Sequence, residues 1–221
     1  MRPTVKIDPS LHGTYREIRL GCIWFKADVQ EPDEEFWELM EEEICPKWAE
    51  YLKSHELPEI EGIRGSREAY KAFGRSPSKY RVSSEALLRR IRQGNELYHV
   101  NSVVDVNNLI SVESGLSVGS YDLANIEGDI VLRVGLDGEG YDGIGKKFLS
   151  MDHMLVLTDD KGLFGSSMSD SHRAMITEDA KEILAVIYCF SDAIDLEQLL
   201  VIAKRAFEDY AEARDVETWI V

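Results

Sequence analysis

Residues 101–122 read Asn-Ser-Val-Val-Asp-Val-Asn-Asn-Leu-Ile-Ser-Val-Glu-Ser-Gly-Leu-Ser-Val-Gly-Ser-Tyr-Asp. Asn101 is suited to cap a helix, because its side-chain oxygen can accept a hydrogen bond from a free N–H of the first turn. Gly115 is suited to end that helix, because glycine readily adopts the positive φ that follows a last helical turn. The sequence therefore predicts a helix over residues 102–114.

Segments with the pattern of strands lie on both sides of this helix. Residues 15–29 precede it and alternate apolar with other residues, as a strand does. Residues 130–134 follow it with the same alternation, and residues 154–164 form a hairpin pattern around an Asp-Asp-Lys-Gly turn. Residues 183–190 are a short, continuous apolar run, which is typical of a strand buried on both faces.

Helical patterns come in runs between these strands. They cover residues 33–43, 66–73 and 83–94, and a last helix begins after Asp195. Because strands and helices do not alternate as repeated β-α-β units, the pattern predicts an α+β fold rather than a doubly wound one. No repeat or linker interrupts the chain, so we interpret residues 1–221 as a single domain.

The composition gives little sign of a prosthetic group. Of the residues, 44% are hydrophobic and 30% are charged, as in an ordinary globular protein. The three cysteines, Cys22, Cys45 and Cys189, show no Cys-x-x-Cys spacing, so neither a disulfide framework nor a metal site is expected. No phosphate-binding or dinucleotide-binding motif occurs either, and we expect no cofactor.

The sequence also predicts a location in the cytoplasm. The first nine residues lack the apolar core of a signal peptide. The longest apolar run, residues 183–190, is far shorter than the roughly 20 residues that a membrane-spanning helix needs. We therefore expect a cytoplasmic protein that does not enter a membrane.

The charge is unevenly distributed. The chain carries a formal net charge of -16, but nine basic and only two acidic residues lie between Arg64 and Arg92, which gives that segment +7 and the remainder -23. A basic segment on an acidic body can bind a phosphate backbone in a salt-sensitive way. It can equally be the solvated face of two helices. Both interpretations stay open at this point.

The run of residues 101–113, with its Asn-x-Val-Val-Asp-Val-x-Asn pattern, resembles a helix in the beta subunit of phenylalanyl-tRNA synthetase. The order and spacing of later features also match, so that the resemblance covers residues 64–192, with residues 1–63 and 193–221 as flanks. In that subunit the region comprises the third and fourth B modules, and it hydrolyses tyrosine wrongly esterified to the phenylalanine tRNA. The resemblance implies a barrel-like or sandwich-like β core decorated by helices, and the aminoacylated 3′ end of a tRNA as partner.

The resemblance also assigns candidate site residues. Asn108 matches the asparagine that lines the family's editing pocket, where a carboxamide can orient water or the ester, and Asn107 replaces a threonine. The family's histidine falls on Gly119. The glutamate that reads the tyrosine hydroxyl falls on Val186, so a preference for tyrosine is not expected, because discrimination by a hydroxyl needs a polar partner.

Other candidate residues lie in two further segments. The loop over residues 169–173 could supply a replacement site, in which His172 could act as a base and Arg173 could bind a carboxylate or a phosphate. Asp170 of the same loop is a candidate for contact with the substrate. Within the basic segment, four arginines are candidates for contacts with RNA. These are Arg64, Arg67, Arg89 and Arg90.

Three functions are compatible with these features. The first is a trans-acting deacylase that hydrolyses mischarged tRNA without a metal, since it retains Asn108 and the polar loop. The second is a non-catalytic module that binds tRNA or an amino acid, since the family's histidine and glutamate are missing. The third is a small-molecule binder independent of RNA, which the net charge of -16 favours. Complete ligase activity is not expected, because the adenylation machinery lies in other domains of the synthetase.

Overall fold

Strand β9 (Glu182–Cys189) lies at the centre of the molecule and is buried on both faces. The computed structural model describes residues 2–145 and 147–221, and it places β9 inside an antiparallel sheet with the order β10-β2-β9-β3. The neighbouring strands are β2 (Arg19–Lys26), β3 (Ser117–Asp122) and β10 (Arg214–Ile220). The predicted buried strand over residues 183–190 is confirmed.

A second sheet covers one face of the first. Its order is β1-β4-β7-β8, in which β1 pairs parallel to β4 and the other pairs are antiparallel. Its strands are β1 (Val5–Ile7), β4 (Ile130–Val134), β7 (Leu155–Asp159) and β8 (Gly162–Gly165). A small separate hairpin consists of β5 (Gly140–Asp142) and β6 (Phe148–Ser150).

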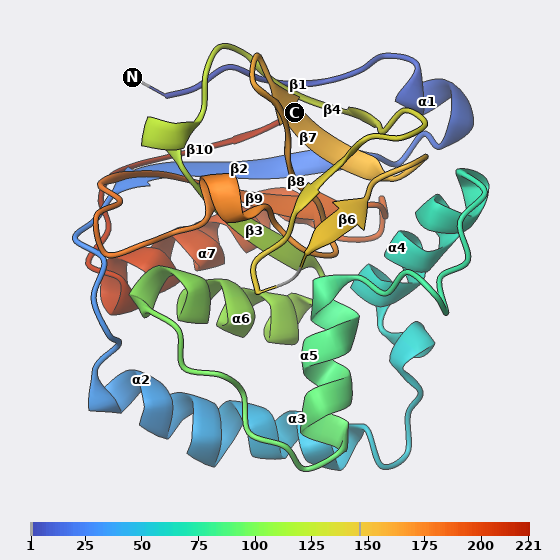
Figure 1. Cartoon of the computed structure of the whole chain (residues 1–221). Coiled ribbons are helices and arrows are strands. Elements are labelled where there is room, and N and C mark those ends of the chain that lie inside the picture. Colours follow the sequence, from blue (N-terminus) through green and yellow to red (C-terminus); the bar gives the residue numbers. More distant parts are fainter. Residues whose placement is uncertain (1, 146) are drawn as a thin grey trace.

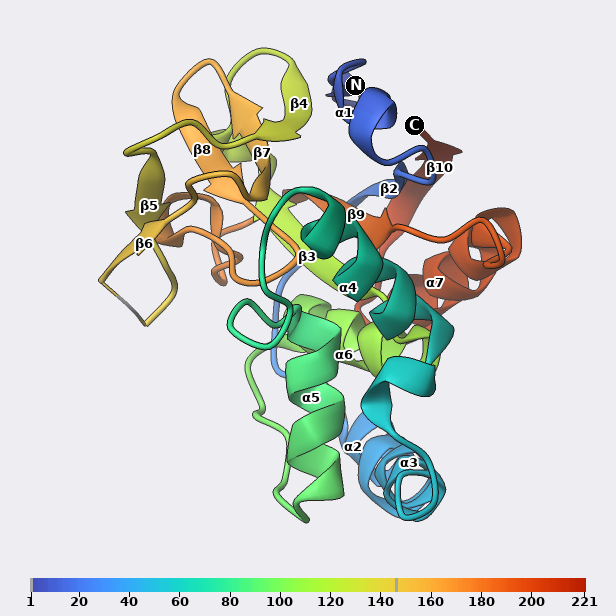
Figure 2. The same cartoon turned by 90° about the vertical axis from the view of Figure 1, so that its right-hand side faces the viewer.

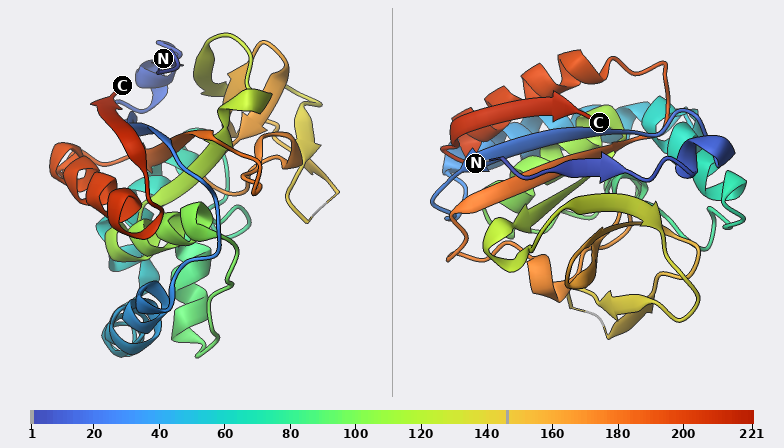
Figure 3. Two further views of the ribbon diagram at one scale, coloured as in Figure 1. Left: turned by 90° about the vertical axis from the view of Figure 1, so that its left-hand side faces the viewer. Right: turned by 90° about the horizontal axis from the view of Figure 1, so that it is seen from above.

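Helices cover the other face of the first sheet, so that the molecule has helices, central sheet and second sheet in succession (Figures 1 and 2). Figure 3 shows α7 and the strands β4 to β8 on opposite sides of the central sheet. The α-helices are α1 (Leu11–Thr14), α2 (Glu34–Glu38), α3 (Cys45–Tyr51), α4 (Glu61–Ala72), α5 (Ser83–Arg92), α6 (Ser102–Ser114) and α7 (Leu196–Tyr210).

Short helical segments complete the secondary structure. A π-helix, Leu39–Ile44, joins α2 to α3. Three 3₁₀ helices cover Leu57–Glu59, Leu123–Asn125 and His172–Ala174.

The alternation of side chains along β9 builds two cores. Ile183, Ala185, Ile187 and Cys189 belong to the core under the helices, whereas Leu184, Val186 and Tyr188 belong to the core between the sheets. Successive side chains of a strand point to opposite faces, so one strand can serve both layers only if nearly all of its residues are apolar. The predicted α+β fold is confirmed. Within the described residues the two sheets have the sandwich-like arrangement, and they do not close into a barrel.

Local signals placed some helix ends correctly. The side chain of Asn101 accepts a hydrogen bond of 3.0 Å from the N–H of Val104, and Gly115 has a φ of 71°. The predicted helix over residues 102–114 is therefore confirmed with both of its caps. The helix predicted over residues 83–94 begins without a side-chain cap: Val82 occupies the N-cap position, and neither Ser83 nor Ser84 accepts a capping hydrogen bond.

At the start of α5, other segments replace the missing cap. The N–H of Ser83 bonds to the carbonyl of Ser167 at 2.8 Å, and the N–H of Ser84 bonds to the hydroxyl of Ser117 at 3.2 Å. These partners satisfy backbone donors that the first turn of a helix leaves free. The start of α5 is thereby fixed to the segment that follows β8 and to β3.

Strand β10 was missed from the sequence. Its residues, Arg214–Ile220, are mostly exposed and rich in charge, as is typical of an edge strand. The pairing of β10 with β2 also shifts register between Arg214 and Glu217. Such an irregular strand lacks the clean apolar alternation by which strands are predicted.

No helix in the described part of the chain is both long enough and apolar enough to cross a membrane.

We predict that the contact between α4 and the end of β9 tolerates only glycine at position 65. A Cβ atom at Gly65 would lie 2.6 Å from the carbonyl oxygen of Phe190. Alanine normally stabilises a helix interior by about 0.5–1 kcal/mol relative to glycine. Gly65→Ala should instead lower the free energy of unfolding by about 1–3 kcal/mol, because backbone must move apart.

Chemical denaturation measures this change. Gly13→Ala is the matched control, since a Cβ atom at Gly13 has nothing within 4 Å. If Gly65→Ala proved as stable as the parent protein, the close approach of α4 to β9 would be wrong.

Candidate functional site

A polar cluster lies between the two sheets, in a core that is otherwise apolar. The hydroxyls of Tyr121 on β3 and Tyr188 on β9 are 2.7 Å apart, and both residues are buried. The Tyr121 hydroxyl also donates to Oδ1 of Asp170 at 2.7 Å. A tyrosine hydroxyl carries one proton, so Tyr188 must donate to Tyr121 while Tyr121 donates to Asp170. The cluster is a directed chain of hydrogen bonds that ends on a carboxylate.

Asp170 is the group in this cluster that titrates near neutral pH. Burial raises the pKa of its carboxyl to about 7, although the hydrogen bonds from Tyr121 and from the N–H of Ser166 oppose the rise. The residue as a whole is partly exposed, but its carboxyl is buried against Tyr121 and the backbone of Ser166. Burial likewise raises the pKa of Tyr121 and Tyr188 well above the ordinary value, so their hydroxyls stay protonated.

Two glycines make room for the Tyr121 side chain. A Cβ atom at Gly119 would overlap the Tyr121 hydroxyl and would lie 3.1 Å from Oδ2 of Asp170. A Cβ atom at Gly165 would overlap the same hydroxyl and the ring. Gly119 also pairs with Val186, which is fully buried. The structure therefore brings together three residues singled out from the sequence, Gly119, Asp170 and Val186.

The loop that carries Asp170 is held by hydrogen bonds from other elements. The hydroxyl of Tyr141 donates to the carbonyl of Ser169 at 2.5 Å. The hydroxyls of Tyr70 and Ser167 are 2.7 Å apart. None of these tyrosines, nor Tyr121 and Tyr188, was predicted from the sequence as a site residue. For Tyr188 the available signal was its position inside the apolar strand β9, because a buried hydroxyl needs a hydrogen-bond partner.

The two asparagines lie on α6, on the other side of β3. Oδ1 of Asn107 accepts a hydrogen bond of 2.9 Å from the hydroxyl of Ser120. Ser120 and Tyr121 are consecutive on a strand, so their side chains point to opposite faces. β3 consequently stands between Asn107 and Asp170. Asn108 is half-buried on the same helix, and its role stays a prediction.

His172 and Arg173 follow Asp170 but have different surroundings. His172 is exposed and lines a surface depression with Asp142 and Lys147. The guanidinium of Arg173 lies 2.9 and 3.0 Å from the two carboxylate oxygens of Asp159. Burial alone would raise the pKa of Asp159, but hydrogen bonds from Arg173 and from two backbone N–H groups hold it below its ordinary value. The charge of Arg173 is thus already paired within the protein.

The four arginines of the basic segment also have partners within the protein. Nη1 of Arg67 lies 3.0 Å from both carboxylate oxygens of Glu85, which is buried, and Arg89 lies 4.0 Å from the same group. Arg64 pairs with Glu61. Arg90 donates to the hydroxyl of Tyr98 at 3.1 Å and lies over its ring. These contacts reduce the free positive charge of the segment, and binding of RNA there stays a prediction.

Among residues 2–145 and 147–221, no group of three or more His, Cys, Asp or Glu side chains is arranged to hold a metal ion.

Comparison with known proteins identifies the matching region. The model of the B3/4 domain family matches residues 65–200, and this match confirms the resemblance inferred for residues 64–192. A phenylalanine–tRNA ligase beta subunit from Chromobacterium violaceum is 27% identical over 125 residues, which cover 52% of this chain and 16% of that protein.

A solved structure is also similar. It is an N-terminal fragment of the phenylalanyl-tRNA synthetase beta subunit from Pyrococcus horikoshii, with 11% identity and a TM-score of 0.48. The alignment covers 98% of this chain and 50% of that chain. The present chain thus spans half or less of the length of each of these two relatives.

We predict that Arg67 is needed for stability. Arg67→Ala would leave the carboxylate of Glu85, whose side chain is only 3% exposed, without its bidentate partner. The free energy of unfolding should fall by about 2–4 kcal/mol, because a buried charge loses its compensation. Arg64→Ala, which removes an exposed pair, should cost less than about 1 kcal/mol. If Arg67→Ala and Arg64→Ala lowered the free energy of unfolding by the same amount in denaturant titrations, the charge of Glu85 would be compensated without Arg67.

The raised pKa of Asp170 predicts how stability depends on pH. Between the ordinary pKa of an aspartate and about 7, the folded protein binds more protons than the unfolded chain. The free energy of unfolding should therefore fall as the pH rises through this window, by about 2–4 kcal/mol for Asp170. Asp105, whose pKa is raised by burial to about 6, contributes in the lower part of the window.

Denaturant titrations at about pH 6 and pH 7 weight the measurement toward Asp170, because Asp105, with the lower pKa, contributes less than Asp170 between these values. Asp170→Asn should remove most of the slope between these values. A slope that remained unchanged in this variant would mean that Asp170 ionises in the folded protein as freely as in the unfolded chain.

Proposed function

The chain belongs to the B3/4 domain family, and from this membership we propose that it hydrolyses the ester bond of mischarged aminoacyl-tRNA in trans. The similar protein from Chromobacterium violaceum is named a phenylalanine–tRNA ligase beta subunit, and this similarity is the reason to propose a tRNA as substrate. The observation that carries the proposal is Asp170. A carboxyl with a pKa of about 7 lies beside Gly119, where the resemblance places the family's histidine.

Asp170 has the properties of a general base. Such a base works best when its pKa lies near the working pH, since it is then both partly deprotonated and basic enough to accept a proton. The hydrogen bond from Tyr121 fixes the orientation of Asp170, and the proposal requires that water reach the buried carboxyl from the exposed part of the residue. An imidazole is then not required at position 119.

The reaction can be written with these groups. The Asp170 carboxylate accepts a proton from a water molecule, whose oxygen forms a bond to the ester carbonyl carbon. The bond between that carbon and the terminal ribose oxygen then breaks, and the ribose oxygen takes up the proton. The products are the free amino acid and the deacylated tRNA. Positioning of water and ester supplies the remaining acceleration.

Neighbouring residues have supporting roles in this proposal. Tyr121 is a positioning residue, and Val186 makes the adjoining surface apolar, so hydrolysis should not favour tyrosyl over phenylalanyl esters. Asn108 and Asn107, the catalytic residues that the resemblance assigns on α6, stay a separate prediction, because β3 stands between Asn107 and Asp170. His172 offers an exposed alternative base two residues after Asp170. Arg64, Arg67, Arg89 and Arg90 are the proposed contacts with the tRNA, and Arg173 is proposed to bind a carboxylate or a phosphate of the substrate.

A non-catalytic tRNA-binding or amino-acid-binding module is the second candidate. It is favoured by the position of the Tyr121 hydroxyl, which fills the space that a side chain at position 119 would take. In this alternative Asp170 and the tyrosines only stabilise the core, and hydrolysis is absent.

We predict that loss of the Asp170 carboxyl abolishes ester hydrolysis. Purified protein is incubated with a panel of mischarged tRNAs, and the loss of the ester is followed over time. Asp170→Asn should lower the rate by about 100-fold or more, the contribution of a positioned base. The matched control is Asp142→Asn, which neutralises an exposed acid beside His172 and should retain the parent rate.

A pH profile tests the role of Tyr121. The hydrogen bond from Tyr121 lowers the pKa of Asp170, so in Tyr121→Phe the midpoint of the dependence of the rate on pH should move to higher pH. If the parent protein binds tRNA but hydrolyses none of the esters, the binding module is correct and the deacylase is not. If activity survives in Asp170→Asn but is lost in His172→Ala, the base is His172.

A further inference from the structure

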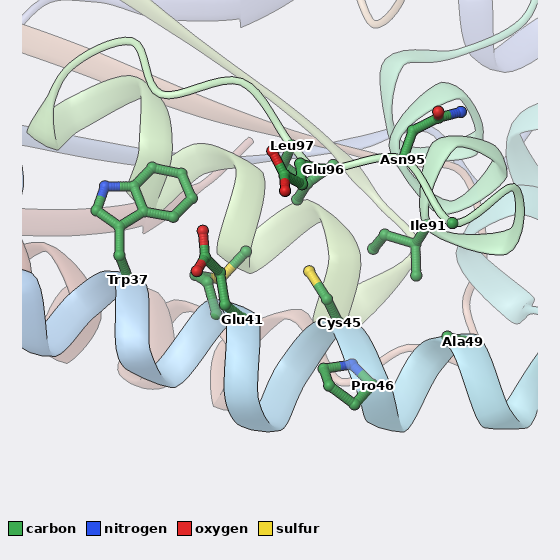
Figure 4. Close-up of a pocket in the computed structure, with 11 residues that line it drawn as sticks. Trp37, Glu41, Cys45, Pro46, Ala49, Ile91, Asn95, Glu96 and Leu97 are labelled. Atoms are coloured by element: carbon green, nitrogen blue, oxygen red, sulfur yellow. The ribbon is translucent and has the colours of Figure 1, made fainter.

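A cavity lies between the helical arm formed by α2, the π-helix and α3 and the segment that follows α5 (Figure 4). Its volume is about 340 Å³. This lies within the range of pockets that hold small molecules, roughly 300–1,000 Å³. Gly94, with a φ of 72°, ends α5 and turns the chain so that residues 95–97 form the wall opposite the arm.

Apolar side chains form most of the walls. Trp37, Met40 and Cys45 come from the arm, and Ile91 and Leu97 face them from the other side. The indole of Trp37 stacks on the ring of His99, with centroids 3.4 Å apart and planes 7° apart. This stack fixes the orientation of an aromatic surface at one end of the cavity before any ligand arrives.

The charged groups of the cavity are of one sign. Glu41 comes from the arm and Glu96 from the opposite segment, and Figure 4 shows both carboxylates entering the space between the two. Neither lysine nor arginine is among the residues that line the cavity. Eight of the thirteen residues from Glu31 to Glu43 are acidic, so the surrounding potential is negative as well.

The backbone at this cavity is unusual. Met40 and Glu41 belong to the π-helix Leu39–Ile44, a form that is rare and that frequently accompanies functional sites. The wider turn of a π-helix changes which side chains share a face. Met40 is consequently buried in the helical core and also lines the cavity, with the Glu41 carboxylate beside it.

Cys45 does not make this a site of covalent chemistry. Burial raises the pKa of its thiol, and the charge of Glu41 adds to the rise. A thiol that holds its proton at neutral pH is a poor nucleophile. Cys45 therefore contributes an apolar, polarisable wall, and binding here is reversible.

We propose that this cavity binds a small organic cation, in which a primary ammonium group is attached to a short apolar or aromatic body. The ammonium would lie between the carboxylates of Glu41 and Glu96, and the body would pack against Trp37, Met40 and Leu97. The arm, residues 34–51, lies outside the region matched by the family, 65–200, whereas the opposite wall of the cavity lies inside it.

Calorimetric titration of the full chain with 2-phenylethylammonium tests the proposal. At about pH 8 the ammonium group of the ligand is charged, as that of an ordinary lysine is. The neutral analogue 2-phenylethanol has nearly the same shape and should bind about tenfold more weakly. Glu41→Gln and Glu96→Gln should each weaken binding of the cation by about 3- to 10-fold, as expected for partly exposed charge contacts.

Glu42→Gln is the matched control, because it removes the same charge from the same helix at a residue that does not line the cavity. This substitution should leave the affinity for the cation unchanged. The NMR signal of the Trp37 indole N–H should shift when the cation is added, both in the parent protein and in this variant. The proposal is overturned if the cation does not bind at millimolar concentration, if the alcohol binds as tightly as the cation, or if Glu42→Gln weakens binding as much as Glu41→Gln.

Discussion

Burial of β9 on both faces is the constraint on which the rest of the structure depends. Its side chains supply the helix-covered core and the core between the sheets in alternation, so neither layer can shift without exposing the other. The register with β2 extends over Arg19–Lys26 without interruption, and the register with β3 sets Gly119 opposite Val186. The position of the polar cluster therefore follows from the pairing of this one strand.

The cluster of Tyr121, Tyr188 and Asp170 is costly in such a setting. A buried carboxyl and two buried hydroxyls each need a partner, because an unmatched polar group in a core loses its hydration without compensation. These groups form hydrogen bonds with one another, and Asp170 is the one whose pKa, about 7, lies near neutral pH. A stable core alone would not require this arrangement. Its cost is the physical reason to assign the cluster a function.

The two proposed sites differ in what they demand of the chain. Ester hydrolysis depends on Asp170 and lies within the region matched by the family, 65–200. Binding of an organic cation depends on the arm that precedes this region, where Glu41 and Trp37 line the cavity beside α5. The segment after α5 forms the other wall, and the start of α5 is bonded to Ser167 in the segment that follows β8. Helix α5 thus contacts both the cavity and the segment that leads to Asp170.

The sequence by itself determined the elements whose signals are local. Asn101 and Gly115 delimit α6 because a cap and a positive φ act within one turn, and the short apolar run at residues 183–190 is typical of a buried strand. The family resemblance also came from the order of residues along the chain. Only the tertiary structure decided that Gly119, Asp170 and the tyrosines meet, and that β3 separates Asn107 from them. Such contacts join residues tens of positions apart, and their geometry depends on strand register and on which face each side chain takes, which no local pattern encodes.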